Sequence, residues 1–268
     1  GVIHWLEENG YSIASISGCS MGALIGGIYA AGELDKFEHW VRAVTKIDIV
    51  TLLDVSWNKS GLVKGDKIIN TLVELVGNQR IEDLPINYTA VAADIKNEKE
   101  VWINSGSLFD AIRASISLPL FFTPYAHNGV KLIDGGVLNP VPIAPTFSDG
   151  TQMTVAVNLG GSMEGDRLVQ DVPTEPVADS MQLHEKISSY IKQFQQNSGS
   201  ESELNWGMYD IANQAFDAMQ STIARQKLAA YPPDYTIEIA RNACGTLEFD
   251  RADEMIDLGY RKAQENLC

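Results

Sequence analysis

Hydrophobic residues along the chain fall into short continuous runs that alternate with longer stretches of helical spacing. The runs are rich in Ile, Val and Ala and predict strands within residues 11–17, 88–95, 100–106, 129–133, 152–160 and 235–240. Apolar positions three and four apart predict an opening helix that ends at Asn9-Gly10, and further helices over residues 20–31, 34–45, 64–76, 107–115, 205–229 and 251–267. Because strands and helices alternate, we expect a layered α/β fold with a central, mostly parallel sheet flanked by helices.

The 268 residues are 45% hydrophobic and show no internal repeat, so we expect one domain spanning residues 1–268. Residues 161–205 are polar and rich in Ser, Gly and Gln, which predicts a variable insertion that is able to move. The helix over residues 205–229 is expected to turn one apolar face to the core. That face carries Met208, Ile211, Ala215, Phe216, Met219 and Ile223.

A second apolar stripe lies inside the polar insertion. It consists of Leu183, Ile187, Tyr190, Ile191 and Phe194. A helix laid on the core is the simpler explanation of this stripe, and a lid that contacts a membrane is the alternative.

The charge balance is acidic, with 20 Lys and Arg against 35 Asp and Glu and a net charge of -15. Such a charge repels nucleic acid and anionic membranes at long range, so we expect no nucleic-acid partner and at most a transient membrane contact. The three cysteines, Cys19, Cys244 and Cys268, have no paired or metal-binding spacing, and no apolar run reaches the length of a membrane span. The sequence therefore predicts a soluble, cytoplasmic protein that needs no metal or cofactor.

The pentapeptide GCSMG at residues 18–22 stands between a predicted strand and a predicted helix. This G-x-S-x-G context is typical of a nucleophile elbow, in which Ser20 sits on a strained turn and Gly18 and Gly22 leave room for its side chain. The positive end of the following helix would favour the negative charge that develops during acyl transfer. The alternative is that Ser20 only caps the helix.

A serine nucleophile needs a base, and the chain offers two kinds. Of the four histidines, only His184 fits the Ser, acid, His order of a conventional triad, and its neighbours form no motif. Asp134 ends an apolar strand and is followed by Gly135 and Gly136, so it would lie near Ser20 at the carboxyl ends of strands. Ordinary turn chemistry is the alternative explanation of this Asp-Gly-Gly.

Together, GCSMG and the distant DGG resemble the patatin-like phospholipase family, whose members use a Ser-Asp dyad. The blocks SGLVKGDK (60–67), AIRASISLPLFFTPY (111–125) and IDGGVLNPVPI (133–143) are similar to that family's blocks in the same order. The resemblance covers residues 1–159 well and the last helix loosely. It implies that Ser20 is the nucleophile, that Asp134 is the base, and that residues 113–124 wall the site.

Two departures from the family pattern stand out. Cys19 replaces the threonine of many relatives, and we expect it to be a packed small residue rather than a second nucleophile. The family's glycine-rich loop, which supplies the oxyanion hole, would precede Gly1, and Met21 N–H is expected to supply one donor by analogy with α/β-hydrolases.

The sequence therefore predicts a serine hydrolase that cleaves carboxylic esters of lipids, as a lysophospholipase, phospholipase A or esterase. A non-catalytic lipid-binding protein on the same fold, and an esterase or acyltransferase that uses His184, are the alternatives.

Overall fold

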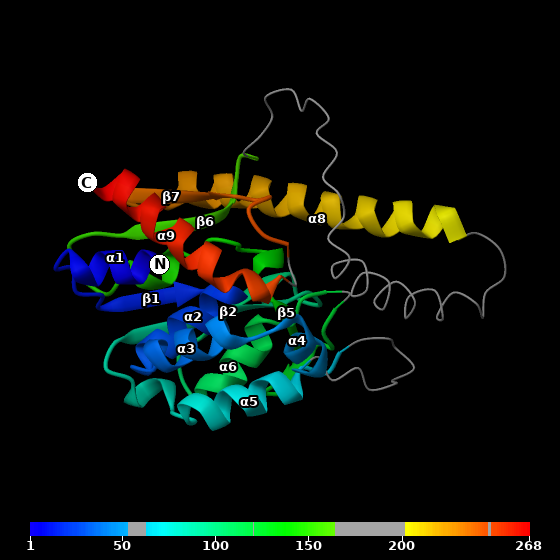
Figure 1. Ribbon diagram of the computed structural model, residues 1–268, viewed down its shortest axis with the longest axis horizontal. Coiled ribbons are helices and arrows are strands. Elements are labelled where there is room, and N and C mark those ends of the chain that lie inside the picture. Colours follow the sequence, from blue (N-terminus) through cyan, green and yellow to red (C-terminus); the bar gives the residue numbers. More distant parts are fainter. Residues whose placement is uncertain (53–62, 120, 164–201, 246–247) are drawn as a thin grey trace.

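Residues 1–52, 63–119, 121–163, 202–245 and 248–268 are described by a computed structural model (Figure 1). The strands form a five-stranded sheet and a two-stranded sheet, and helices pack on both. This arrangement confirms the predicted layered α/β fold. His184, the apolar stripe between residues 183 and 194, and most of the predicted insertion 161–205 lie outside the described residues.

The larger sheet is organised around β2. Its strands are β1 (Ser15–Gly18), β2 (Asn87–Asp94), β3 (Lys99–Ile103), β4 (Tyr125–His127) and β5 (Val130–Asp134). Only β1 is parallel to its partner: β3 and β5 are antiparallel to β2, and β4 is antiparallel to β5. The sheet is thus mixed rather than mostly parallel as expected. Short turns join β2 to β3 and β4 to β5, and such turns connect only antiparallel neighbours.

Helices cover the larger sheet and enclose the main hydrophobic core. They are α2 (Met21–Ala30), α3 (Leu34–Ala43), α5 (Asp66–Val76) and α6 (Leu108–Ser115). The short helix α4 (Lys46–Leu52) follows α3 and contacts Phe249–Arg251 instead. Ile28, Leu72 and Phe109 from three of these helices pack with Ala90 and Ala92 of β2 in this core, and all five are almost completely buried. The small side chains of β2 allow the helices to approach the sheet closely.

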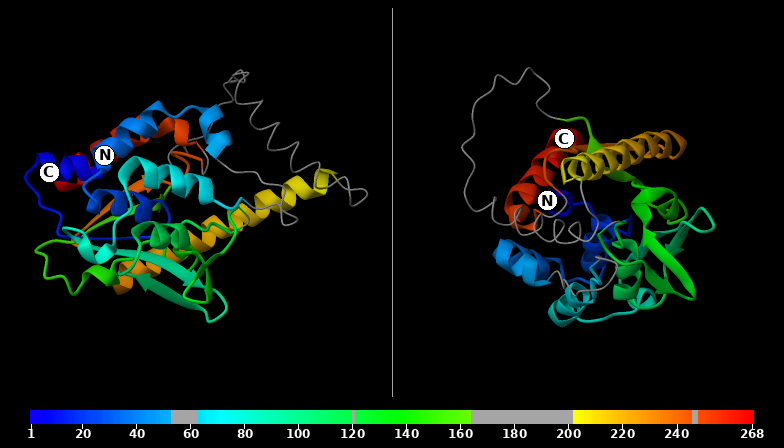
Figure 2. Two further views of the ribbon diagram at one scale, coloured as in Figure 1. Left: turned by 90° about the horizontal axis from the view of Figure 1, so that it is seen from below. Right: turned by 90° about the vertical axis from the view of Figure 1, so that its right-hand side faces the viewer.

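The smaller sheet consists of β6 (Val155–Gly161) and β7 (Tyr235–Ala240), which are parallel. The helices α1 (Val2–Glu8) and α9 (Ala252–Leu267) pack on β7 through Trp5 and Ala263, which share a core with Ile237. On the other face, Ala224 of α8 (Ser202–Ala230) packs with Ala156 of β6. Figure 2 shows α8 and α5 on opposite sides of the molecule.

The predicted long helix exists as α8, but its predicted core face is wrong at three positions. Ile211 is 67% exposed, Met219 is 57% exposed and Ala215 is exposed too, whereas Ser221 and Ala224 are buried. Figure 1 shows the N-terminal part of α8 running past the ends of the sheets, so that only its C-terminal half packs on β6. Helical spacing alone could not distinguish the packed part from the projecting part.

Candidate functional site

Ser20 occupies the sharp turn between the end of β1 at Gly18 and the start of α2 at Met21. Its φ of 52° and ψ of −124° lie in a region that residues other than glycine rarely adopt, which is the strained geometry of a nucleophile elbow. Although Ser20 stands at the N-cap position of α2, its side chain makes no capping hydrogen bond. The helix-capping alternative therefore does not account for this serine.

The two glycines of the pentapeptide have different roles. A Cβ atom at Gly18 would lie 2.3 Å from the carbonyl carbon of Gly22, which only glycine avoids. A Cβ atom at Gly22 would meet nothing within 4 Å in the described part of the chain. The tight turn thus depends on Gly18, and the expectation that Gly22 makes room for Ser20 has no steric support.

Ser115, at the C-terminal end of α6, fixes the backbone of the elbow. Its Oγ accepts a hydrogen bond from Ser20 N–H at 3.1 Å and donates one to the carbonyl of Val91 at 2.6 Å. The side chain is completely buried. Ser115 belongs to the segment expected to wall the site, residues 113–124. Its hydrogen bond to Ser20 joins two residues that are 95 positions apart in the sequence.

Asp134 is the last residue of β5 and is 1% exposed. One carboxylate oxygen, Oδ1, accepts a hydrogen bond from Gly136 N–H at 2.7 Å, and Oδ2 has no hydrogen-bond partner in the described part of the chain. Burial raises the pKa of Asp134 from 3.8 to about 6, although the Ser20 side chain and Gly136 N–H both favour the charged form. The carboxylate thus combines a free oxygen with a pKa near neutrality, as a general base requires.

The pairing on β2 brings these two groups together. Gly18, at the end of β1, pairs with Ala90, and Asp134, at the end of β5, pairs with Ala92. Since β3 occupies the other edge of β2 at both positions, β1 and β5 share one edge. They run in opposite directions along it, so their carboxyl ends meet head-on beside Val91.

The first glycine of the Asp-Gly-Gly sequence is required by this meeting of strands. A Cβ atom at Gly135 would lie 2.1 Å from the carbonyl oxygen of Val91, which is backbone and cannot move aside. At Gly136 the nearest atom would be Nε2 of Gln220 on α8, at 2.7 Å. The two glycines thus let the chain pass close to the backbone of β2 and to the side chains of α8.

Cys19 and Met21 flank the serine. Cys19 is buried, its thiol donates a hydrogen bond to the carbonyl of Pro140 at 3.5 Å, and burial raises its pKa well above the usual value. It is therefore a packed thiol, as expected, because the thiolate is the reactive form. Met21 is the first residue of α2, and helices leave their first N–H groups without intrahelical partners.

A polar cluster ties the loop after β5 to α8. Asn139, which is 1% exposed, donates from Nδ2 to Glu100 at 2.9 Å, and Lys227 of α8 donates to the same carboxylate at 2.5 Å. Asn139 N–H also donates to the carbonyl of Gly135 at 2.8 Å. Sequence alone gives no sign of this cluster, because its members are separated by up to 127 positions.

The histidines that the structure describes do not complete a triad. His4 bonds to Glu38 and His127 contacts Asn128, and neither they nor His39 is hydrogen-bonded to Ser20 or Asp134. In the same part of the chain, no group of three or more His, Cys, Asp or Glu side chains is placed to hold a metal ion.

Comparison with known proteins identifies the family of this chain. The sequence model described as patatin-like phospholipase matches residues 1–147, which include Ser20 and Asp134. The chain belongs to the patatin-like phospholipase family. An uncharacterized NTE family protein of Mycobacterium bovis is 34% identical, over all of this chain and 86% of the relative.

Other patatin-like relatives are larger proteins. Lysophospholipase NTE1 of Saccharomyces cerevisiae is 29% identical over 60% of this chain, which spans 10% of that protein. Among solved structures, VipD from Legionella pneumophila matches 98% of this chain and 63% of its own at a TM-score of 0.43 and 15% identity. The family and its lysophospholipase members support a lipid hydrolase at this coarse level. Within the described residues, no helix is long and apolar enough to cross a bilayer.

Proposed function

We propose that this patatin-like protein is a Ser-Asp hydrolase that cleaves the carboxylic ester of a lipid, with Ser20 as nucleophile and Asp134 as base. The observation that carries the proposal is the pairing of a strained Ser20 with a buried Asp134 whose Oδ2 is free. The described part of the chain offers the serine no histidine, so the carboxylate would take its proton directly.

In the acylation step, Ser20 Oγ attacks the ester carbonyl carbon while its proton moves to Asp134 Oδ2. The tetrahedral intermediate then collapses: the bond from carbon to the leaving oxygen breaks, and the proton on Asp134 passes to that oxygen. The products are the free alcohol and an ester of the acyl group with Ser20. Met21 N–H, at the positive end of α2, can donate to the oxygen that carries the negative charge.

Deacylation repeats these steps with water. Asp134 accepts a proton from the attacking water, the new tetrahedral intermediate expels Ser20 Oγ, and the proton returns to the serine. The net reaction consumes one ester and one water and yields one carboxylic acid and one alcohol. A pKa near 6 suits this exchange, because the carboxylate must both accept and return a proton near neutral pH.

The substrate we favour is a lipid ester, as a lysophospholipase, phospholipase A or lipid esterase would use. Relatives named lysophospholipases and the patatin-like family support this substrate class. The proposed reaction needs no cofactor and no metal.

The test uses the full-length protein with three variants: Ser20→Ala, Asp134→Asn, and Ser148→Ala as the control at an exposed serine. We expect Ser20→Ala to abolish both fatty-acid release from lysophosphatidylcholine and labelling by a fluorophosphonate. Asp134→Asn should lower kcat by about 100- to 10,000-fold, which is the range for loss of a general base. Full activity of Asp134→Asn would refute the dyad, and an unlabelled wild-type protein would favour the non-catalytic lipid-binding alternative.

A further inference from the structure

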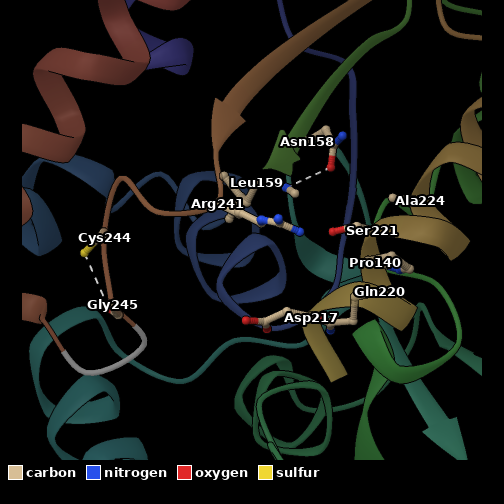
Figure 3. Close-up of a pocket in the computed structure, with 11 residues that line it drawn as sticks. Pro140, Asn158, Leu159, Asp217, Gln220, Ser221, Ala224, Arg241, Cys244 and Gly245 are labelled. Carbon is tan, nitrogen blue, oxygen red and sulfur yellow. Dashed lines mark hydrogen bonds between the residues drawn. The ribbon is translucent and has the colours of Figure 1, made fainter. Parts of the chain in front are cut away.

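A polar cavity of about 230 Å³ lies at the carboxyl ends of β6 and β7 (Figure 3). Four parts of the chain line it: Pro140, the end of β6 at Asn158 and Gly160, the segment after β7 that begins with Arg241, and the face of α8 that carries Ser221. In parallel strand pairs, binding groups gather at this end. The mechanism proposed above uses none of these side chains.

Two largely buried residues carry polar side chains at this cavity. Asn158 is 4% exposed, and its Oδ1 faces Gly160 and accepts a hydrogen bond from the N–H of that glycine at 3.0 Å. Ser221 is 7% exposed, and its hydroxyl makes no hydrogen bond within the described residues. A Cβ atom at Gly160 would lie 3.3 Å from Asn158 Oδ1 and 3.4 Å from Ser221 Oγ, so both side chains converge on this glycine.

A cation completes the set. The backbone N–H of Arg241 donates to the carbonyl of Gly161 at 3.2 Å, and Figure 3 shows its side chain reaching across the cavity toward Ser221 and Asn158. Within the described residues, its guanidinium forms no ion pair. Asp217 of α8 lines the same cavity and, in Figure 3, points away from the guanidinium.

The cavity adjoins the dyad on its α8 side. Pro140, which lines it, accepts the hydrogen bond of Cys19, the residue before Ser20. Gln220, which also lines it, approaches the Cβ position of Gly136, whose N–H holds Asp134. A molecule whose ester lies at Ser20 could therefore place a polar group in this cavity.

We propose that this cavity binds the phosphodiester headgroup of a glycerophospholipid whose acyl ester lies at Ser20, with Arg241 and Ser221 as donors to the phosphate oxygens. The inference rests on the proposed hydrolase activity. Arginine and neutral donors together match the several acceptor oxygens of a phosphodiester. Because the cavity is lined by the carboxylate of Asp217 as well as by Arg241, a zwitterionic headgroup with a cationic ammonium group fits better than a free phosphate ion.

The kinetic test compares two substrates with the same acyl chain, palmitoyl lysophosphatidylcholine and monopalmitoylglycerol, which lacks the phosphate. Arg241→Gln should lower kcat/KM for the phospholipid about 10-fold or more, chiefly through KM, because a hydrogen bond to a charged group is lost. Hydrolysis of monopalmitoylglycerol should be unchanged. The control is Arg225→Gln, because Arg225 is an exposed arginine of α8 that bonds Thr222 and does not line the cavity. Equal effects of Arg241→Gln on both substrates would overturn the proposal.

A binding test separates this site from the reaction. Glycerophosphocholine, which has the headgroup but no ester, is titrated calorimetrically into wild type, Ser20→Ala and Arg241→Gln. We expect binding to wild type and to Ser20→Ala, with a loss of about 10-fold or more in Arg241→Gln. No binding to wild type, or equal binding to Arg241→Gln, would overturn the headgroup site even if the hydrolase activity stands. Inorganic phosphate that binds as tightly as glycerophosphocholine would also overturn it, since the cavity would then be a simple anion site.

Discussion

The buried carboxylate of Asp134 should weaken the fold that holds it. Burial raises the pKa of Asp134 from 3.8 to about 6, so the folded chain holds this proton more tightly than the unfolded chain does. The bound proton of Asp134 therefore stabilises the folded chain fully below about pH 3.8, and this stabilisation is lost as the pH rises through about 6. At pH 8 the charged carboxylate therefore costs about 3 kcal/mol, because about two pKa units separate the two states.

Asp134→Asn removes this cost and keeps an oxygen that can accept the hydrogen bond of Gly136. We expect the variant to gain about 3 kcal/mol in the free energy of unfolding at pH 8, or about 6–12 °C in Tm, while it loses activity. The gain should shrink toward zero near pH 4. Parallel denaturant and thermal unfolding of wild type and variant across this pH range measures it.

The matched control is Asp94, which ends the neighbouring strand β2. The side-chain amide of Asn97 donates a hydrogen bond to the carboxylate of Asp94, and backbone N–H groups donate further ones. These hydrogen bonds lower the pKa of Asp94. The charged form of Asp94 stabilises the fold at pH values above the pKa that this residue has in the unfolded chain. Asp94→Asn should therefore lower the free energy of unfolding at pH 8. If Asp134→Asn is less stable than wild type at pH 8, or if its gain does not change with pH, the charged carboxylate is not the destabilising group and the reasoning is refuted.

Three further outcomes are expected. The pH profile of kcat/KM should rise to a plateau through an apparent pKa of about 6, since Asp134 must be charged, and a profile flat from pH 5 to 8 would contradict this base. Ser115→Ala leaves the N–H of Ser20 without its partner and should cost about 1–3 kcal/mol of stability and lower kcat, both measurable on the purified variant. Gly18→Ala should fail to accumulate as folded protein, whereas the free energy of unfolding of Gly22→Ala should lie within about 1 kcal/mol of wild type. Similar destabilisation by both substitutions would contradict the clash assigned to Gly18.

Local sequence was sufficient for the parts of the site that depend on a few consecutive residues. The turn at Ser20 requires a strand end, a glycine without room for a Cβ and a helix start, all within seven residues. Asp134 was predictable in the same way, because an apolar strand ends in a polar residue and two glycines.

The meeting of β1 and β5 could not be predicted in this way. It depends on which residues of β2 each strand pairs with, and this register is decided by tertiary packing rather than by either strand's own sequence. One signal of the mixed sheet was present. Asn128-Gly129 is a two-residue hairpin turn, and both residues have positive φ, at 48° and 80°. That turn predicts the antiparallel pair β4–β5.

The strained backbone at Ser20 also limits the evolutionary routes open to this position. Glycine would relax a φ of 52°, but it would remove the hydroxyl. Threonine would keep a hydroxyl, but its branched side chain is poorly tolerated at positive φ. Cysteine keeps one heavy atom on Cβ and places a nucleophilic atom where the serine hydroxyl stands, so it is the replacement that changes the nucleophile with the least change to the turn.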